Sequence, residues 1–280
     1  MIARPDYEEL VRAALREDAP SGDPFGESFP ADGSGTFIAC AEGVFCGGPV
    51  AEEVLRQVDP SVTVSFVPEG RRVAPGERVG EASGPVAALL RGERVALNFL
   101  QRLSGVATTT ALSAERVAGY GTRLLDTRKT TPLLRALEKY AVRVGGGTNH
   151  RFSLSDGILI KENGIRAAGG IAEALAAARR SAHHLLRVEV EVETLQEAEI
   201  AVRAGADAVL LDNMSPAMVR EAVSRFGGEV FLEASGGIHL GNLEEYARTG
   251  VAGIAVGAIT HSAPALDISF ELARISHQGS

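Results

Sequence analysis

The chain has 280 residues, a net charge of −8 and a pI near 5.4, with 45% hydrophobic and 23% charged residues. These values fit a globular protein with one large or two smaller domains. The acidic balance argues against general binding to nucleic acid or anionic membranes. No apolar run reaches the length of a bilayer span, the N-terminus has no apolar signal core, and the spacing of Cys40 and Cys46 matches no zinc or redox motif. We therefore expect a cytoplasmic protein.

The first hundred residues predict a small α+β domain. Helical periodicity covers residues 4–18 and 49–58, strand-like runs cover 35–41, 62–67 and 78–82, and residues 19–34 are expected to form a loop. Residues 87–118 are rich in Ala and Leu at helical spacing and predict one long helix or two adjoining ones. This segment is expected to link the first domain to the rest of the chain.

From residue 122 onward, short apolar runs alternate with amphipathic helices. The strand candidates are 123–126, 157–161, 186–192, 208–211, 230–233 and 253–256, and the helix candidates are 132–144, 171–180, 195–204, 216–226 and 243–249. Pro132 and Pro216 are expected at first helical positions, where a missing N–H is harmless. Six such units predict an incomplete TIM-like α/β barrel with parallel strands.

The predicted fold is therefore α/β, with an N-terminal α+β sandwich domain. We assign residues 1–105 to that domain and 106–264 to the barrel, and expect the tail, about 265–280, to pack back on the first domain. Each predicted strand of the barrel ends in polar or glycine residues, among them Asp126, Lys161, Glu191, Asp212 and Glu233. Because active sites of such barrels form at the carboxyl ends of the strands, these side chains are expected to meet.

Lysine is rare in this chain and confined to one segment, at Lys129, Lys139 and Lys161. Arginine supplies the other cations, so lysine persists where a compact ammonium is needed. The segment also contains Arg128 and Arg151 and is net positive in an acidic protein. This pattern predicts a pocket for a small polyanion.

Glycine-rich stretches near the last strands favour phosphate binding. Glu233-Ala-Ser-Gly-Gly-Ile238 and Ala255-Val-Gly-Ala258 combine small residues with free backbone N–H groups. Gly145-Gly-Gly147 is equally consistent with a ligand-contacting loop and with a helix C-cap. Neither a Walker loop nor a dinucleotide fingerprint occurs.

Carboxylates at the ends of neighbouring strands predict a second kind of contact. Glu191 and Asp212 could hold Mg²⁺ through waters or stabilise a cationic sugar carbon, or each could pair with a nearby cation. Glu189 and Glu193 share the strand face of Glu191, so spacing does not choose among the three. His150 is either a ligand donor or a structural loop histidine.

Several long motifs resemble the quinolinate phosphoribosyltransferase family, also called nicotinate-nucleotide pyrophosphorylase (carboxylating). They include Gly92–Thr108, Asp126-Thr-Arg-Lys-Thr-Thr-Pro132, Leu137–Arg143, Gly145–Arg151, Leu211-Asp-Asn-Met-Ser215, Glu233–Gly237 and Val256–Asp267. The resemblance extends from about residue 5 to residue 275. It implies transfer of phosphoribosyl from phosphoribosyl pyrophosphate (PRPP) to quinolinate, with release of pyrophosphate and CO₂, to give nicotinate mononucleotide in de novo NAD biosynthesis.

The resemblance also implies residue roles. Arg94, Arg128, His150, Arg151 and Lys161 would bind quinolinate, with Arg94 supplied across a homodimer interface. Lys129, Ser235, Gly236 and Gly257 would bind PRPP. Glu191 and Asp212 would hold the cofactor Mg²⁺, and the catalytic set would be Lys129, Lys161, Glu191 and Asp212.

The chain departs from the family pattern at Leu133, Phe152, Ser153, Ser155 and Gly164. Several of these departures lie close to the residues implied for the acceptor. A phosphoribosyltransferase of the same fold with another acceptor, similar to the molybdenum-operon relatives, is therefore the nearest alternative. A Schiff-base lyase using Lys161 and a catalytically silent binding protein are two further alternatives. Lys139 has no implied role and is expected at the surface or in a dimer contact.

Overall fold

The computed structural model describes residues 7–29 and 31–273. Contacts divide the chain into two compact units. Unit 1 contains the residues up to Ala111, Thr131–Gly146 and the residues from Ala263 onward, and unit 2 contains Leu112–Thr130 and Gly147–Ser262. The sequence assignment gave all of 106–264 to the barrel, whereas Thr131–Gly146 groups with unit 1.

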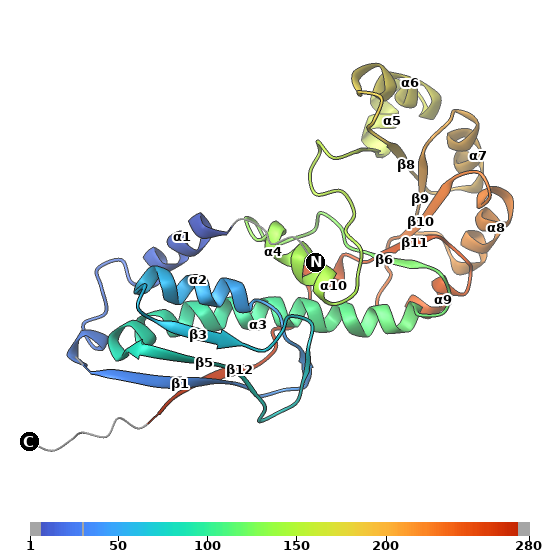
Figure 1. The fold of residues 1–280 in the computed structure, drawn as a ribbon. Helices are drawn as coiled ribbons and strands as arrows, with labels where there is room; N and C mark the ends of the chain where they lie inside the picture. The colour runs from blue at the N-terminus through green and yellow to red at the C-terminus, as the bar shows by residue number, and fades with distance from the viewer. Residues whose placement is uncertain (1–6, 30, 274–280) are drawn as a thin grey trace, which may run out of the picture. The chain divides into compact units, whose positions relative to one another are not determined.

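Unit 1 is built on an antiparallel sheet with the strand order β12-β1-β5-β3 (Figure 1). Its elements are α1 (Glu8–Asp18), a 3₁₀ turn (Gly26–Ser28), β1 (Asp32–Ala39), β2 (Gly43–Val44), α2 (Gly48–Val58), β3 (Thr63–Phe66), β4 (Arg72–Val73), β5 (Arg78–Pro85), α4 (Arg135–Val144) and β12 (Ile268–Leu272). The short strands β2 and β4 form a separate pair. Residues 4–6 of the predicted first helix lie outside the described residues, as do residues 274–280 of the predicted tail.

A group of aromatic side chains packs together in unit 1. The Phe37 ring lies 4.6 Å from that of Phe270 and 5.1 Å from that of Phe66, and Phe45 stacks on Phe66 at 5.7 Å. Phe270 comes from β12, which pairs with β1 along its length. The segment after residue 265 therefore contributes both a strand and a core side chain to unit 1. The strand β1 begins at Asp32, inside the segment that was expected to be loop.

The long segment α3 (Val86–Val117) is one continuous helix. The sequence predicted either this form or two adjoining helices. The helix predicted at 132–144 begins only at Arg135, so the expectation that Pro132 is its first residue is wrong. Leu133 explains the late start, because its φ of 66° lies in the left-handed region and cannot continue into a helix. Pro216, in contrast, is the first residue of α8, after the capping side chain of Ser215.

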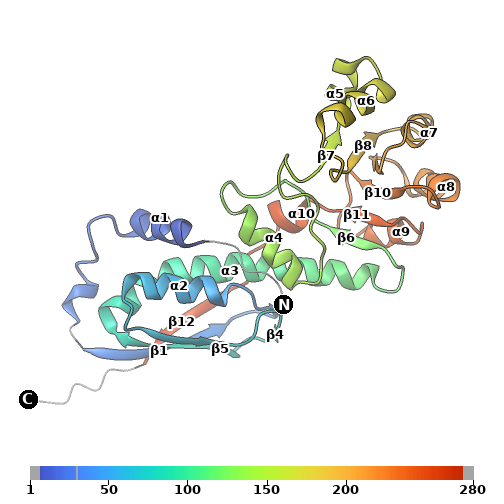
Figure 2. The ribbon, with the colours of Figure 1, turned by 45° about the horizontal axis from the view of Figure 1, so that its top comes forward.

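Unit 2 has six parallel strands in the order β6-β11-β10-β9-β8-β7 (Figure 2). They are β6 (Arg123–Leu125), β7 (Ile158–Ile160), β8 (Val188–Val192), β9 (Ala208–Asp212), β10 (Phe231–Ser235) and β11 (Gly253–Ala255). The helices are α5 (Glu162–Ala168), α6 (Ile171–Ser181), α7 (Leu195–Arg203), α8 (Pro216–Phe226), α9 (Leu243–Ala247) and α10 (Ala258–His261). The predicted α/β class and the six-stranded incomplete barrel are confirmed.

The free edge of β6 is occupied by the segment that leads to β7. Thr148 donates its N–H to the Leu124 carbonyl at 2.8 Å and accepts from the Asp126 N–H at 3.1 Å. These two backbone bonds place Thr148 alongside β6, where a further barrel strand would lie. His150 follows two residues later and donates its N–H to Asp126 Oδ1, just after β6.

The strand β8 shows why the barrel has a polar interior. Its sequence Val188-Glu-Val-Glu-Val192 alternates, and the three valines are buried on one face. Because successive side chains of a strand point to opposite faces, Glu189 and Glu191 share the other face.

In the described part of the chain, no helix is long and apolar enough to cross a membrane.

Candidate active site

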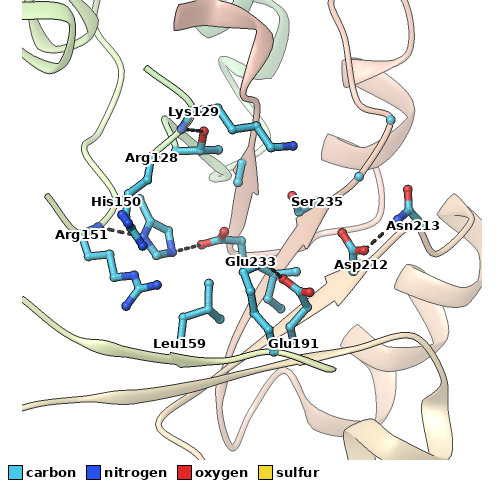
Figure 3. Close-up of a pocket in the computed structure, with 16 residues that line it drawn as sticks. Arg128, Lys129, His150, Arg151, Leu159, Glu191, Asp212, Asn213, Glu233 and Ser235 are labelled. Atoms are coloured by element: carbon cyan, nitrogen blue, oxygen red, sulfur yellow. Dashed lines mark hydrogen bonds and ion pairs between the residues drawn. The ribbon is translucent and has the colours of Figure 1, made fainter. Parts of the chain in front are cut away.

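A cavity of about 370 Å³ lies in unit 2, and its lining comes from the carboxyl ends of the barrel strands (Figure 3). The lining residues are Thr127, Arg128, Lys129, His150, Arg151, Leu159, Lys161, Glu191, Leu210, Asp212, Asn213, Glu233, Ser235, Gly236, Gly237 and Ala255. The predicted meeting of polar strand ends is therefore found at the expected edge of the sheet. All lining residues belong to unit 2.

Two cations enter the cavity from the turn after β6. The Lys129 N–H donates to Thr127 Oγ1 at 3.0 Å, and the Lys129 carbonyl accepts from Thr260 Oγ1 at 2.8 Å. Both the N–H and the carbonyl of Lys129 are thus hydrogen-bonded, while the residue as a whole is exposed. Arg128 contributes a guanidinium whose Nε is buried and has no hydrogen-bond partner.

Arg151 is a half-buried cation of the segment that leads to β7. One terminal nitrogen donates to the Gly157 carbonyl at 2.8 Å, which fixes the side chain against the loop. Burial lowers the pKa of Arg151, and the nearby charge of Arg128 lowers it further. Two guanidiniums that repel each other in a half-buried site favour an anionic ligand between them.

Lys161 and Glu191 form an ion pair between the end of β7 and the neighbouring strand β8. Asp212, at the end of β9, accepts from Asn213 Nδ2 at 2.7 Å. Glu191 and Asp212 both line the cavity, whereas Glu193 lies beyond the strand and donates its N–H to Glu197 at the start of α7. The structure therefore selects Glu191 over Glu193 as the cavity carboxylate.

Small residues form one wall of the cavity after β10. Gly236 has a φ of 87°, and a Cβ built there would lie 2.4 Å from Asn213 Oδ1. Only glycine can occupy this position without moving Asn213, because both the space and the backbone conformation exclude a side chain. Ser235, Gly236 and Gly237 consequently present a wall of hydroxyl and backbone groups, as expected for a phosphate contact.

Two of the lining residues, His150 and Glu233, form a polar cluster with Glu189, and both carboxyl residues are buried. His150 Nε2 is 3.0 Å from Glu189 Oε2 and 3.6 Å from Glu233 Oε2. Burial raises the pKa of Glu233, and the charges of Glu189 and Asp126 raise it further. Asp126 itself accepts from Asn149 Nδ2 at 2.6 Å and from the His150 N–H at 2.8 Å.

The ligand atoms of this cluster lie within 4.8 Å of one another, close enough for one metal ion. The imidazole argues against a metal. His150 Nδ1 accepts from the Arg151 N–H at 2.7 Å, so the ring proton of neutral His150 is on Nε2, where the metal would bind. Nε2 instead acts as a donor to Glu189.

Most of the predicted site residues line the cavity. They are Arg128, Lys129, His150, Arg151, Lys161, Glu191, Asp212, Ser235 and Gly236. Gly257 does not, although a Cβ there would lie 3.1 Å from Lys129 Cδ. Arg94 lies on α3 in unit 1, is exposed, and is not a lining residue.

Seven of the lining residues were absent from the predicted site residues, among them Glu233 and Asn213. Glu233 is two positions before Ser235 on β10 and therefore shares its face, a signal that the sequence contained. Asn213 adopts a left-handed φ of 54°, which sequence spacing does not reveal. The expectation that Lys139 lies at the surface is wrong, because only 3% of the residue is exposed.

Comparisons with known proteins agree with this fold and site. Residues 28–104 match the family described as quinolinate phosphoribosyl transferase, N-terminal domain, and residues 106–271 match the corresponding C-terminal domain. A Bacillus subtilis protein named probable nicotinate-nucleotide pyrophosphorylase [carboxylating] is 43% identical over 94% of this chain and 92% of its own. The human nicotinate-nucleotide pyrophosphorylase [carboxylating] is 42% identical over 94% of this chain and 90% of its own.

Solved structures extend the likeness to three dimensions. The nicotinate-nucleotide pyrophosphorylase of Francisella tularensis has a TM-score of 0.94 and 41% identity, covering 97% of this chain and 98% of its own. Human nicotinic acid phosphoribosyltransferase, at 15% identity and a TM-score of 0.64, shares the fold alone. The barrel and its cationic cavity define a phosphoribosyltransferase-type enzyme. This chain belongs to the quinolinate phosphoribosyltransferase family.

Proposed function

We propose that this protein transfers the phosphoribosyl group of PRPP to quinolinate, with loss of CO₂, to give nicotinate mononucleotide and pyrophosphate. The reaction is a step of NAD biosynthesis, and we expect it to occur in the cytoplasm. The observation that carries the proposal is the cluster of four cations, Arg128, Lys129, Arg151 and Lys161, around one cavity of an acidic chain. A pyridine dicarboxylate together with a pyrophosphate-bearing sugar supplies the matching negative charge.

In this proposal the acceptor lies at the His150–Arg151 wall. Arg128, Arg151, His150 and Lys161 bind the two carboxylates, because guanidinium groups suit carboxylates through paired hydrogen bonds. Lys129, Ser235 and Gly236 bind the phosphoribosyl donor on the other side of the cavity, with Gly257 supporting Lys129. This division follows the opposite placement of the Arg151 loop and the β10 turn around the cavity in Figure 3.

The chemistry then follows from charge. The ring nitrogen forms a bond to the sugar carbon while the bond to pyrophosphate breaks, and the sugar carbon becomes cationic in the transition state. Glu191 and Asp212 stabilise that positive charge, and Lys129 stabilises the departing pyrophosphate. The C–C bond to the adjacent carboxyl group then breaks, its electron pair is stabilised by the positively charged ring nitrogen, and the carbon takes up a proton.

Mg²⁺ is the proposed cofactor, and the residues fit it. Carboxylate oxygens are its preferred protein ligands, and one or two carboxylates together with substrate phosphates commonly suffice. Glu191 and Asp212 both line the cavity and come from adjacent strands. When bound, the ion would neutralise charge on the pyrophosphate, while Lys161 and Asn213 orient the two carboxylates.

We also propose that the active form is a homodimer, with Arg94 reaching the active site of the partner subunit. Arg94 is exposed on α3 and is not a lining residue of the cavity. Among the described residues, no hydrogen bond or ion pair holds its side chain. An uncommitted arginine is suited to complete a dicarboxylate site elsewhere.

A different acceptor is the second candidate, because of the departures from the family pattern. The cavity favours quinolinate, since none of Leu133, Phe152, Ser153, Ser155 and Gly164 lines it. A Schiff-base mechanism is disfavoured because Lys161 is engaged with a carboxylate, whereas imine formation requires a free amine. Borohydride trapping with substrate tests that alternative directly.

The decisive experiment measures turnover of quinolinate in the presence of PRPP and Mg²⁺, with nicotinate as the control acceptor. We expect nicotinate mononucleotide, pyrophosphate and CO₂ in equal amounts from quinolinate, and no product from nicotinate. Turnover of nicotinate alone, or of neither acid, would contradict the proposed acceptor.

A further inference from the structure

The described residues contain only two buried side-chain nitrogen or oxygen atoms without a hydrogen-bond partner: Arg128 Nε and Glu233 Oε1. Both residues line the same cavity. Buried polar atoms are paired in the great majority of cases, and an unpaired one destabilises the fold. Two such atoms at one cavity indicate that a ligand is their missing partner.

Glu233 is held where a negative charge is unfavourable. Only 2% of the residue is exposed, and Figure 3 shows its carboxyl group beside His150 on the floor of the cavity. Glu189 of β8 and Asp126 after β6 face it with negative charge. The backbone partners of Glu233 in the sheet are Leu210 on β9 and Gly253 on β11, neither of which brings a positive charge.

His150, the nearest nitrogen donor, does not supply that charge. Its Nδ1 accepts from the Arg151 N–H, so the single ring proton lies on Nε2, which is 3.0 Å from Glu189 and 3.6 Å from Glu233. The proton is therefore committed to Glu189. Asp126 accepts hydrogen bonds from Asn149 Nδ2 and from the His150 N–H. Glu233 Oε1 has no hydrogen-bond donor, and Glu233 Oε2 has His150 Nε2 only at 3.6 Å.

We propose that Glu233 is a neutral carboxylic acid in the folded protein and donates a hydrogen bond to one carboxylate of the acceptor. This inference rests on the proposed function and identifies a binding residue within the same site. Burial, Glu189 and Asp126 all raise the pKa of Glu233, in agreement with the neutral form. Enzymes do keep buried carboxylic acids neutral so that they can act as hydrogen-bond donors.

The consequence is a matched pair of donors for an aromatic dicarboxylate. Arg128 Nε and the Glu233 hydroxyl each require an acceptor, and a ring with two carboxylates brings both. A ring with one carboxylate leaves one buried donor unpaired, which lowers affinity much more than the loss of an apolar contact. Glu233 would thus contribute to the discrimination between quinolinate and nicotinate.

Two substitutions separate the donor from the charge. Glu233→Gln keeps a neutral hydrogen-bond donor of the same shape, and Glu233→Met keeps the size but removes the donor. We expect the quinolinate dissociation constant, measured by calorimetry, to change by less than about 3-fold in Glu233→Gln and to rise about 10–100-fold in Glu233→Met. The PRPP dissociation constant should stay unchanged in both variants. Glu53→Gln, at a buried carboxyl paired with Arg56 in unit 1, controls for neutralising a buried acid.

The pH dependence gives a second readout. Quinolinate affinity of the wild-type protein should fall on the alkaline side as Glu233 ionises, and that fall should be absent in Glu233→Gln. Infrared difference spectra of wild type against Glu233→Gln at neutral pH should contain the C=O band of a protonated carboxyl, and the band should shift when quinolinate binds.

The outcomes distinguish the two proposals. Wild-type protein that neither binds nor converts quinolinate overturns the proposed function. Wild-type protein that converts quinolinate overturns the role of Glu233 alone if Glu233→Met binds the acid equally well, if Glu233→Gln loses as much affinity as Glu233→Met, or if the protonated carboxyl band is absent.

Discussion

Lys161 and Glu191 form an ion pair across β7 and β8, between the residue proposed to bind the acceptor and one proposed to hold Mg²⁺. The family resemblance implies that Lys161 binds the acceptor and that Glu191 holds Mg²⁺, yet in the structure the two side chains bind each other. The Lys161 side chain is 57% exposed and that of Glu191 17%, so the pair adds little to the free energy of folding. Its importance lies in orientation, because a compact ammonium fixes the carboxylate without filling the cavity.

Lys161→Arg is therefore expected to impair activity although the charge is kept. The longer planar guanidinium would displace Glu191 and occupy space meant for the acceptor, and a misplacement of about 1 Å lowers turnover on the order of 10²-fold. The measurement is kcat/KM for quinolinate together with the midpoint of thermal unfolding, which should stay within a few degrees. Arg166→Lys, in the exposed pair with Glu162 on α5, is the matched control and should be neutral. Near-normal turnover in Lys161→Arg would contradict the requirement for an ammonium.

Arg94 supplies a prediction about assembly. If each active site takes Arg94 from its partner subunit, Arg94→Ala and Lys161→Ala homodimers should both be inactive. Mixed dimers of the two variants should recover roughly a quarter to a half of wild-type activity, because one of the two sites then contains both native residues. Differently tagged subunits, copurified after mixing, provide the sample. An absence of recovery in verified mixed dimers would refute the partner-supplied arginine.

The raised pKa of Glu233 predicts how the stability of the protein varies with pH. The pKa of Glu233 is raised in the folded protein, so the folded state favours the neutral form. Below the unfolded pKa of about 4.3 the group is neutral in both states, and the free energy of unfolding has its full value with respect to this group. As pH rises through the window between the unfolded and folded pKa values, the unfolded chain ionises first. The free energy of unfolding should then fall by on the order of 1 kcal/mol per pH unit from this group.

Glu233→Gln removes that dependence. Urea unfolding of wild type and variant at about pH 5, 6 and 7 should show a stability difference that shifts in favour of the variant at each step. Glu53→Gln should not show this trend, because Arg56 pairs with Glu53. Parallel stability curves for wild type and Glu233→Gln would mean that Glu233 is ionised in the folded state as well.

The sequence predicted the fold and the cavity where residue types recur at a regular spacing. Alternating apolar runs and helices predicted the six parallel strands, and polar strand ends predicted the cavity, because parallel strands bring their carboxyl ends to one edge. The sequence did not predict features that depend on tertiary contacts. The short helix α5 lacks an apolar face, and its seven residues include none that are buried. Lys139 is polar by type but buried by the packing of α4, which no local pattern reveals.

Leu133 was identified from the sequence as a departure from the family pattern, and the structure shows that its backbone is left-handed. Leu133 has a φ of 66°, and 87% of the residue is exposed. A left-handed conformation costs a residue with a side chain about 1–2 kcal/mol, and glycine adopts it freely at an entropic cost of about 0.5–1 kcal/mol. No packing of the side chain offsets the difference.

Leu133→Gly is therefore expected to stabilise the protein by roughly 0.5–1 kcal/mol, measured by denaturant unfolding. Leu154→Gly is the matched control, because Leu154 is also exposed, at 67%, but does not have a positive φ. Glycine at position 154 should be neutral or destabilising, since it only adds freedom to the unfolded chain. Equal effects of the two substitutions would show that backbone strain at Leu133 does not limit stability. Activity should be unchanged in Leu133→Gly, because Leu133 does not line the cavity.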